Sequence, residues 1–302
     1  MKAVVLTGYG DVEKLELREV DDPNPGPRQI KVKVAGASIN PVDWKIRRGE
    51  MRSMLPLHLP TILGRDVSGE VVAVGQDVTE FRVGDRVMGL VEHGYAELVV
   101  GSVDAFAKLP REIELERAAA LPLVGLTGSQ LVKEGVGIRA GERVLVTGAL
   151  GSVGRVAVFT AKQRGAQVVA GVRSRQRTQA EKLNVDDIVA VDLPDEIKRM
   201  RPVDAIADTV NGKVVLSLLD KVKPGGVVGT VLGPPPGAEK QGLRVHAILT
   251  HPDAERLAEI GEAVVKGQLV LPVDRRFPLE LAQVAQHVAE AGGIGKVLLV
   301  PS

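Results

Sequence analysis

The sequence has 302 residues, 44% of them hydrophobic and 25% charged, which is typical of a globular protein with a well-formed core. At about 150 residues per domain, this length predicts two domains. The 39 basic and 38 acidic residues leave a net charge of +1, so no overall field attracts nucleic acid or an anionic membrane. Cysteine is absent, which excludes disulfides, thiolate metal sites and cysteine nucleophiles. Aromatic residues make up only 2%, too few for a surface that stacks nucleic-acid bases.

No segment has the composition of a signal peptide or of a membrane span. The apolar run at the N-terminus is too short for the hydrophobic region of a signal peptide. No window approaches about 18 uninterrupted apolar residues, the minimum for a spanning helix. We therefore expect a cytoplasmic protein that does not enter a membrane.

The segment before Pro110 is predicted to be mainly β-structure. Residues 29–34 alternate between polar and apolar side chains, as in a half-buried strand. One short helix is predicted after Asn40, because asparagine is a good N-cap, Pro41 suits the first helical position and Gly49 ends the segment. Further short strands are predicted from β-rich runs at 67–75, 85–91 and 95–100.

From Arg143 onward, predicted strands alternate with predicted helices. The strands cover residues 143–147, 167–172, 187–192, 203–210, 226–232 and 243–249, and the helices between them cover 152–164, 175–183 and 213–221. Such alternation predicts an α/β domain in which helices cover both faces of a parallel sheet. The tail is predicted to contain a helix at 253–266, a strand at 269–273, a helix at 278–291 and a strand at 296–300.

A glycine-rich turn follows the strand that ends at Thr147. A strand, a glycine turn and a helix in this order let backbone N–H groups and the positive helix end approach a pyrophosphate. The spacing GxxGxxG is a variant of the dinucleotide fingerprint, and the alternative is a tight turn without a ligand. The predicted cofactor-binding residues of this turn are Gly148, Gly151, Ser152, Val153 and Gly154.

The end of the next predicted strand indicates which nucleotide binds. A site for NAD needs an acidic residue there for the ribose 2′-hydroxyl. This strand ends instead in Arg173, Ser174 and Arg175, with Arg177 following. Arginines and a hydroxyl suit a 2′-phosphate, so we predict NADP, held by Arg173, Ser174 and Arg177. The alternative is a solvated basic helix start, which the helix dipole disfavours.

The remaining chemistry points to an acceptor that is already electron-poor. Reduction of an ordinary ketone benefits from a metal that polarises the carbonyl. The sequence has no cysteine, and none of its histidines has metal-ligand spacing: His58, His93, His246, His251 and His287. We therefore predict no metal site, and quinones, conjugated enones and enals are the acceptors that fit.

Ordered motifs along nearly the whole chain resemble one family. They are Asn40-x-x-Asp43-x-x-x-Arg47-x-Gly49, the run from Pro60 through Asp66 to Gly75, Gly84-Asp85-Arg86-Val87, Tyr95-Ala96-Glu97, residues 118–122, Gly125-Leu126-Thr127 and Gly295-Lys296-Val297. In these the chain resembles the medium-chain dehydrogenase/reductase superfamily, and within it the zinc-free, zeta-crystallin-like NADPH:quinone oxidoreductases. Zinc members carry Gly-His-Glu where this chain has Gly64-Arg65-Asp66.

The resemblance implies an architecture and a set of roles. It implies a GroES-like β-barrel catalytic domain over residues 1–110 and 250–302, an inserted Rossmann domain over 111–249, and a homodimer. It implies that Asn40 and Asp43 face the nicotinamide and that Thr127 lies near it. The alternative for Asn40 is a plain helix cap, with Asp43 in the first helical turn.

Other candidate residues come from their place in the predicted elements. Val231, Leu232 and Gly233 follow a predicted strand at the edge where parallel sheets hold ligands, so they are predicted to bind the cofactor. The proton is expected to come from solvent, and Lys45, Asp43 and Tyr95 are the candidates if a side chain donates it. Trp44, the only tryptophan, is expected either in the barrel core or in the substrate wall.

These features predict an enzyme that transfers hydride from NADPH to a quinone without a metal. One alternative is an NADPH-dependent reductase of activated C=C bonds in a 2-enal, an enone or an enoyl thioester. A second is a protein that binds NADPH without catalysis. The expected partners are a small quinone or enone substrate and a second copy of the chain.

Overall fold

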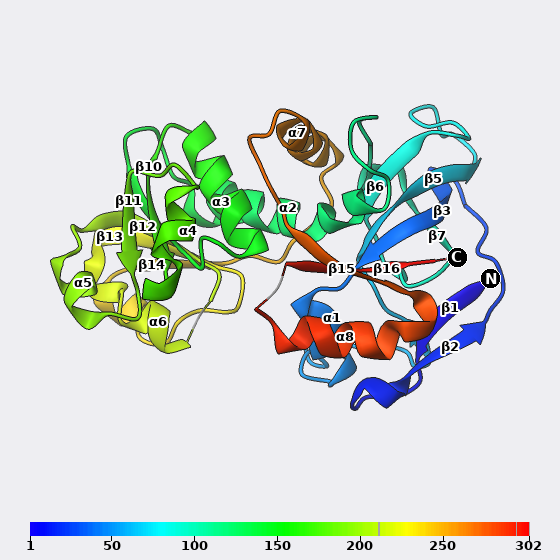
Figure 1. The fold of residues 1–302 in the computed structure, drawn as a ribbon, viewed down its shortest axis with the longest axis horizontal. Coiled ribbons are helices and arrows are strands. Elements are labelled where there is room, and N and C mark those ends of the chain that lie inside the picture. The colour runs from blue at the N-terminus through cyan, green and yellow to red at the C-terminus, as the bar shows by residue number, and fades with distance from the viewer. Residues whose placement is uncertain (211, 294, 302) are drawn as a thin grey trace. The chain divides into compact units, whose positions relative to one another are not determined.

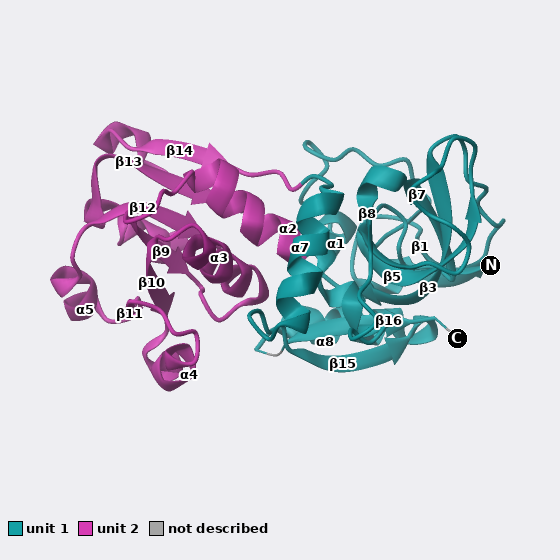
Figure 2. Cartoon of the chain, turned by 90° about the horizontal axis from the view of Figure 1, so that it is seen from above, with its two compact units in different colours: residues 1–123, 251–302 teal, residues 124–250 magenta. Residues whose placement is uncertain are grey.

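The computed structural model describes residues 1–210, 212–293 and 295–301, which form two compact units (Figure 2). The first unit comprises Met1–Leu123 together with His251–Ser302, and the second comprises Val124–Thr250. The second unit is therefore inserted into the sequence of the first. No helix among the described residues is both long and apolar enough to cross a membrane.

The segment between Pro110 and Val124 belongs to the first unit, whereas the family resemblance implies an inserted domain that begins at residue 111. Ser68 donates a hydrogen bond from its hydroxyl to the carbonyl of Leu115. Ala119 and Ala120 are buried against Leu298 of the C-terminal strand. These contacts hold the segment on the first unit before the chain leaves it.

The larger sheet of the first unit is built by both ends of the sequence (Figure 1). Its strands lie in the order β15–β16–β3–β5–β6–β8, and β7 also pairs with β3. β16 pairs antiparallel with β3 and places Leu298 opposite Ser38, so the C-terminal tail completes the N-terminal sheet. The strands are β3 (Gln29–Ser38), β5 (Asp66–Val74), β6 (Arg86–Leu90), β7 (Leu98–Ser102), β8 (Phe106–Lys108), β15 (Val273–Pro278) and β16 (Lys296–Val300).

The core of the first unit lies on one face of β3, as the sequence alternation predicts. Ile30, Val32 and Val34 are buried, while Lys31 and Lys33 between them point away from the core. Successive side chains of a strand point to opposite faces, so the apolar ones share a side. A smaller sheet in the order β2–β1–β4 adds β1 (Lys2–Leu6), β2 (Leu15–Glu19) and β4 (Thr61–Ile62).

The helices of the first unit connect and cover these strands. The α-helices are α1 (Pro41–Arg47), α7 (Ala254–Val265) and α8 (Ala282–Ala291), and the 3-10 turns are η1 (Val12–Lys14), η2 (Val103–Ala105), η3 (Arg117–Ala120) and η8 (Leu279–Leu281). α1 starts directly after β3, and Pro41 occupies its first turn, where a missing N–H costs nothing. The end of β3 and the start of α1 therefore lie side by side.

The sheet of the second unit is parallel throughout its described strands. The strand order is β11–β10–β9–β12–β13–β14. From β9 the chain first adds β10 and β11 on one side and then β12, β13 and β14 on the other, so the order reverses between β9 and β12. Ligands of such sheets bind at the carboxyl ends of the strands near this reversal. The strands are β9 (Arg143–Thr147), β10 (Gln167–Val172), β11 (Asp187–Ala190), β12 (Val203–Asp208), β13 (Val222–Thr230) and β14 (Arg244–Ala247).

Alternate residues of the central strand bury opposite faces of this sheet. Val144 and Val146 of β9 belong to the core that includes α3, whereas Leu145 belongs to the core that includes α5 and α6. This two-sided burial confirms the predicted doubly wound α/β fold. The helices are α2 (Pro122–Gln130), the π-helical η4 (Leu131–Val136), α3 (Ser152–Gln163), η5 (Ser174–Gln176), α4 (Arg177–Glu181), α5 (Pro194–Arg199), α6 (Gly212–Leu216), η6 (Leu219–Lys221) and η7 (Glu239–Gln241).

The predicted strands at 143–147, 167–172 and 296–300 are confirmed residue for residue, but the strand predicted over residues 269–273 is wrong. Leu269 and Leu271 are buried in a connecting segment, and β15 begins only at Val273. The predicted helix start at Pro278 is also wrong, because Pro278 ends β15. β15 is an edge strand with mostly exposed side chains, so it lacks the alternation that marks a half-buried strand.

Candidate active site and nucleotide site

The glycine turn joins β9 to α3 in the second unit and is packed too closely for larger residues. A Cβ on Gly154 would lie 2.1 Å from the carbonyl oxygen of Gly148. Gly148 itself has a φ of +60°, in the left-handed region that favours glycine. The N-cap of α3 is Gly151, so no side chain caps the first N–H groups of this helix. This arrangement fits a pyrophosphate, because uncapped N–H groups and the helix dipole both attract an anion.

α2 packs directly on the first turn of α3. A Cβ on Gly128 would meet the carbonyl oxygen of Val153 at 2.6 Å, so only glycine permits this approach. Thr127, the residue before it, is buried and shares a 2.7 Å hydrogen bond between its hydroxyl and that of Thr250. The structure thus brings the predicted Thr127 into the neighbourhood of the glycine turn.

A buried polar cluster lies at the carboxyl ends of β9, β12 and β13, beside the glycine turn. Thr147 donates from its hydroxyl to Asp208 at 2.7 Å, and Thr230 donates to the other oxygen of that carboxylate at 3.2 Å. The backbone N–H of Thr209 donates to the hydroxyl of Thr147 at 2.9 Å. These bonds fix the loop ends around the point where the sheet reverses its strand order.

The three predicted residues after β13 lie at this same edge. Leu232 donates its N–H to the hydroxyl of Thr230 at 3.2 Å, and Val231 donates to the carbonyl of Asp208 at 3.3 Å. Gly233 has a φ of +100°, in the left-handed region that favours glycine. Sequence reasoning missed the part that Thr147 plays here, although Thr147 is the last residue of a strand.

The arginine-rich segment after β10 faces two acidic residues that sequence reasoning did not consider. Asp192 accepts hydrogen bonds from the backbone N–H of Ser174 at 2.7 Å and from its hydroxyl at 2.9 Å. Arg177 forms an ion pair with Glu196. Arg173 is exposed and contributes a favourable charge that helps to lower the pKa of Asp192, after the hydrogen bonds from Ser174. Asp192 could have been found from the sequence, because it is the last residue of the next predicted strand, 187–192. Parallel neighbouring strands end at the same edge of a sheet, so Asp192 could have been expected to lie near Ser174.

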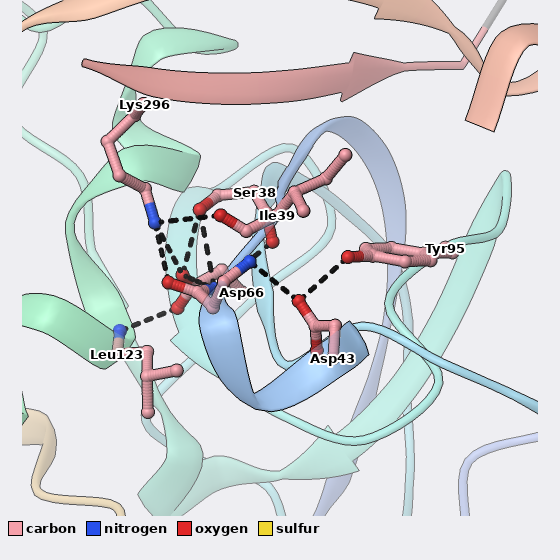
Figure 3. Close-up of polar contacts among 8 residues, drawn as sticks. Ser38, Ile39, Asp43, Asp66, Tyr95, Leu123 and Lys296 are labelled. Atoms are coloured by element: carbon pink, nitrogen blue, oxygen red, sulfur yellow. Dashed lines mark hydrogen bonds and ion pairs between the residues drawn. The ribbon is translucent and has the colours of Figure 1, made fainter. Parts of the chain in front are cut away.

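A second buried polar network lies in the first unit, where β3, β5 and β16 meet α1 (Figure 3). Asp66 accepts hydrogen bonds from the side chain of Asn40 at 2.7 Å, from Ser38 at 3.0 Å and from the backbone N–H of Leu123 at 2.6 Å. Lys296 donates to the side-chain oxygen of Asn40 at 2.6 Å, and its nitrogen lies 3.8 Å from the carboxylate of Asp66. Both ends of the Asn40 amide are therefore occupied inside the unit.

Asp43 forms the second half of this network. One carboxylate oxygen accepts from the hydroxyl of Tyr95 at 2.7 Å and from the backbone N–H of Asn40 at 2.7 Å. The other, Oδ1, is buried without a hydrogen-bond partner in the described structure. Asp43 thus ties the start of α1 to the chain segment that contains Tyr95.

Burial dominates the protonation of these groups. It raises the pKa of Asp43 to about 7, although the bonds from Tyr95 and Asn40 oppose the shift. Burial also raises the pKa of Asp66, against the effect of Lys296, and it lowers the pKa of Lys296. Asp43 consequently changes charge near neutral pH, which is unusual for a carboxyl group.

The predicted catalytic residues differ in their access to a ligand. Asn40 and Asp43 are each only 1% exposed and bind other residues of the same unit. Lys45, further along α1, is partly exposed, and its ammonium group forms no ion pair with a described carboxylate. Trp44 is partly buried against the hydrophobic core of the unit. Asn40 and Asp43 thus hold α1 in place within the unit, while Trp44 packs against the core and Lys45 is partly exposed.

Comparison with known proteins identifies the family. Residues 26–111 match the family described as alcohol dehydrogenase GroES-like domain, and residues 165–299 match the family described as zinc-binding dehydrogenase. Over its full length the chain is 30% identical to the chloroplast envelope quinone oxidoreductase homolog of Arabidopsis thaliana, of which it covers 98%. The chain belongs to the quinone oxidoreductase family of the medium-chain dehydrogenases/reductases.

Other quinone oxidoreductases agree with this assignment. The chain is 30% identical to the quinone oxidoreductase of Pseudomonas aeruginosa, and the match covers 99% of each. The structure of the quinone oxidoreductase from Coxiella burnetii superimposes with a TM-score of 0.88 at 29% identity and covers 99% of both chains. The predicted family and the GroES-like and Rossmann architecture are thereby confirmed. This is a family of NAD(P)-dependent oxidoreductases.

The described residues of this quinone oxidoreductase family member do not fit a zinc site. The sequence has no cysteine, and no group of three or more histidine and acidic residues within the described ranges is placed to hold a metal ion. Arg65, at the position where zinc enzymes resembling this chain carry histidine, pairs with Glu92 at 3.1 Å. Its guanidinium is a cation and offers no lone pair to a metal.

Proposed function

We propose that this chain is an NADPH-dependent quinone reductase that works without a metal. The observation that carries the proposal is its full-length relationship to quinone oxidoreductases, combined with Arg65 in place of a zinc-binding histidine. The NADPH preference rests on the basic segment after β10. The choice of a quinone as the acceptor rests on chemistry: where no Lewis acid activates a carbonyl, the acceptor must already be electron-poor.

The second unit holds the dinucleotide in this proposal. The backbone of Gly148, Gly151 and Ser152 to Gly154 supports the pyrophosphate, because the turn admits close approach and α3 begins uncapped. Val231, Leu232 and Gly233, with Thr127, line the nicotinamide half. Arg173 and Ser174 supply a cation and a hydroxyl for the 2′-phosphate, while Arg177 is partly committed to Glu196.

The first unit positions the groups around the acceptor. When bound, the reduced nicotinamide would supply a hydride, and the quinone, an electron-poor acceptor, would take it together with a proton from solvent. Lys45 provides a partly exposed cation on α1 that stabilises negative charge on the reduced oxygen. Asn40 and Asp43 hold α1 in place through Lys296 and Tyr95. Positioning supplies most of the rate enhancement in this scheme.

Oxidation of NADPH measured with three acceptors tests the proposal. The acceptors are 1,4-benzoquinone, a 2-alkenal and an enoyl thioester, each followed by the loss of absorbance of NADPH. We expect kcat/KM for the quinone to exceed that for the other two by at least tenfold. Turnover of the alkenal or the thioester alone would replace the proposal with reduction of activated C=C bonds. Tight NADPH binding without turnover of any acceptor would identify a binding protein instead.

A further inference from the structure

Asp192 occupies the polar groups of Ser174 that the proposed cofactor site needs. Asp192 follows β11, and Ser174 follows β10, the strand that lies parallel to it. Its carboxylate accepts from both the N–H and the hydroxyl of Ser174, at 2.7 and 2.9 Å. A nucleotide phosphate at this position would use the same two donors.

The charge around these donors is mixed rather than purely basic. Two acidic residues stand among the three arginines of the segment after β10. Asp192 lies near Arg173, and Glu196 forms an ion pair with Arg177. The hydrogen bonds from Ser174 and the nearby charge of Arg173 lower the pKa of Asp192, so its carboxylate is ionised at neutral pH. Asp192 and Ser174 are both exposed, so a ligand can reach them.

We infer that Asp192 is a specificity-determining residue that weakens the preference of this site for NADPH over NADH. The inference rests on the proposed function, since it assumes that Arg173 and Ser174 bind the 2′-end of the cofactor. Asp192 acts as an internal anion that competes with the 2′-phosphate for Ser174. It also offers an acceptor to the 2′-hydroxyl of NADH.

The two cofactors meet this carboxylate differently. A 2′-phosphate carries about two negative charges, so it must displace Asp192 from Ser174 and remain close to a like charge. A 2′-hydroxyl is neutral and donates a hydrogen bond, so Asp192 can keep its bonds and accept another. Because the carboxylate is exposed, solvent and salt screen the repulsion, and the preference shifts by a moderate factor.

Titration of the purified full-length chain with NADPH and NADH measures the effect of Asp192. Asp192→Asn keeps an oxygen that accepts from Ser174 and removes the charge. We expect the ratio of NADPH affinity to NADH affinity to rise roughly three- to tenfold, mainly because NADPH binds more tightly. Adenosine 2′-monophosphate is expected to gain affinity in parallel, whereas adenosine 5′-monophosphate is not.

A matched control variant and a variant of the proposed NADPH site complete the experiment. Asp195→Asn removes the same charge three positions further along, in the first turn of α5, from a side chain that does not contact Ser174. It should leave the ratio within about twofold of the wild-type value. An unchanged ratio in Asp192→Asn, or an equal rise in Asp195→Asn, would overturn the inference. If Arg173→Ala still lowers the ratio in that case, the proposed NADPH site stands, and if Arg173→Ala has no effect, that site is overturned too.

Discussion

Lys296 donates a hydrogen bond of 2.6 Å to the side-chain oxygen of Asn40, a residue 256 positions earlier in the chain. The bond links the last strand, β16, to the start of α1, on which Asp43, Trp44 and Lys45 lie. The same ammonium group lies 3.8 Å from the buried carboxylate of Asp66. The C-terminal tail is thus part of the network that positions the proposed catalytic helix.

We expect Lys296→Met to destabilise the first unit strongly. The substitution leaves the carboxylate of Asp66 buried without its counter-charge, which costs about 3–5 kcal/mol when one partner of a buried pair is removed. Urea unfolding followed by the fluorescence of Trp44 measures the change, because this only tryptophan belongs to the first unit. Lys266→Met, which removes an exposed lysine paired with Glu262, should change stability by less than about 0.5 kcal/mol. Equal midpoints for the two variants would disprove the role of Lys296.

The stability of the first unit should fall as Asp43 ionises. The pKa of Asp43 in the folded chain, about 7, exceeds the value of about 3.9 for an unfolded chain, so the folded state holds this proton more tightly. The stabilisation is complete below about pH 4 and is lost as the pH rises through 7. Relative to Asp43→Asn, which does not titrate, the wild-type chain should lose up to about 1.4 kcal/mol per pH unit across this range.

The measurement compares urea unfolding of the two proteins at several pH values between 4 and 8. Asp66, Lys296 and Tyr95 face Asp43 and are present in both proteins, so their own titration largely cancels in the difference. A stability difference that does not vary with pH would show that Asp43 titrates alike in the folded and unfolded chains.

Arg173→Ala should weaken NADPH binding by about tenfold or more, because a charged hydrogen bond to the phosphate is lost. Binding of NADH, which lacks that phosphate, should change little. Arg177→Ala should have a smaller effect on NADPH, since the guanidinium of Arg177 already binds Glu196. Isothermal titration with both cofactors measures these affinities. Equal losses for NADPH and NADH in Arg173→Ala would rule out a phosphate contact by this residue.

Gly154→Ala should disrupt the glycine turn. Its Cβ would lie 2.1 Å from the carbonyl oxygen of Gly148, and both atoms belong to the backbone of a packed turn, so we expect a cost of about 3 kcal/mol or more. Thermal unfolding and NADPH titration should both show the loss. Gly8→Ala, where the nearest atom is a lysine side-chain carbon at 3.9 Å, serves as the control and should behave as the wild-type chain. Normal stability and cofactor affinity in Gly154→Ala would contradict the close packing of the turn.

The sequence by itself determined the features that depend on neighbouring residues. The strands at 143–147, 167–172 and 296–300, the glycine turn and the start of α3 were all predictable, because apolar runs and turn residues act over a few positions. The resemblance to the family added the expectation that one domain is inserted in the sequence of the other. The edge strand β15 was missed, because exposed side chains give a strand no apolar pattern.

Only the tertiary structure decided which charges meet. The end of β10 contains no acidic residue, yet Asp192 reaches Ser174 because β10 and β11 are parallel neighbours whose ends coincide. Lys296 reaches Asn40 because β16 pairs with β3 across almost the whole length of the chain. Burial then shifts the pKa of Asp43 to about 7, which no local pattern encodes. Strand pairing brings distant residues together, and the loss of water around them sets their charge.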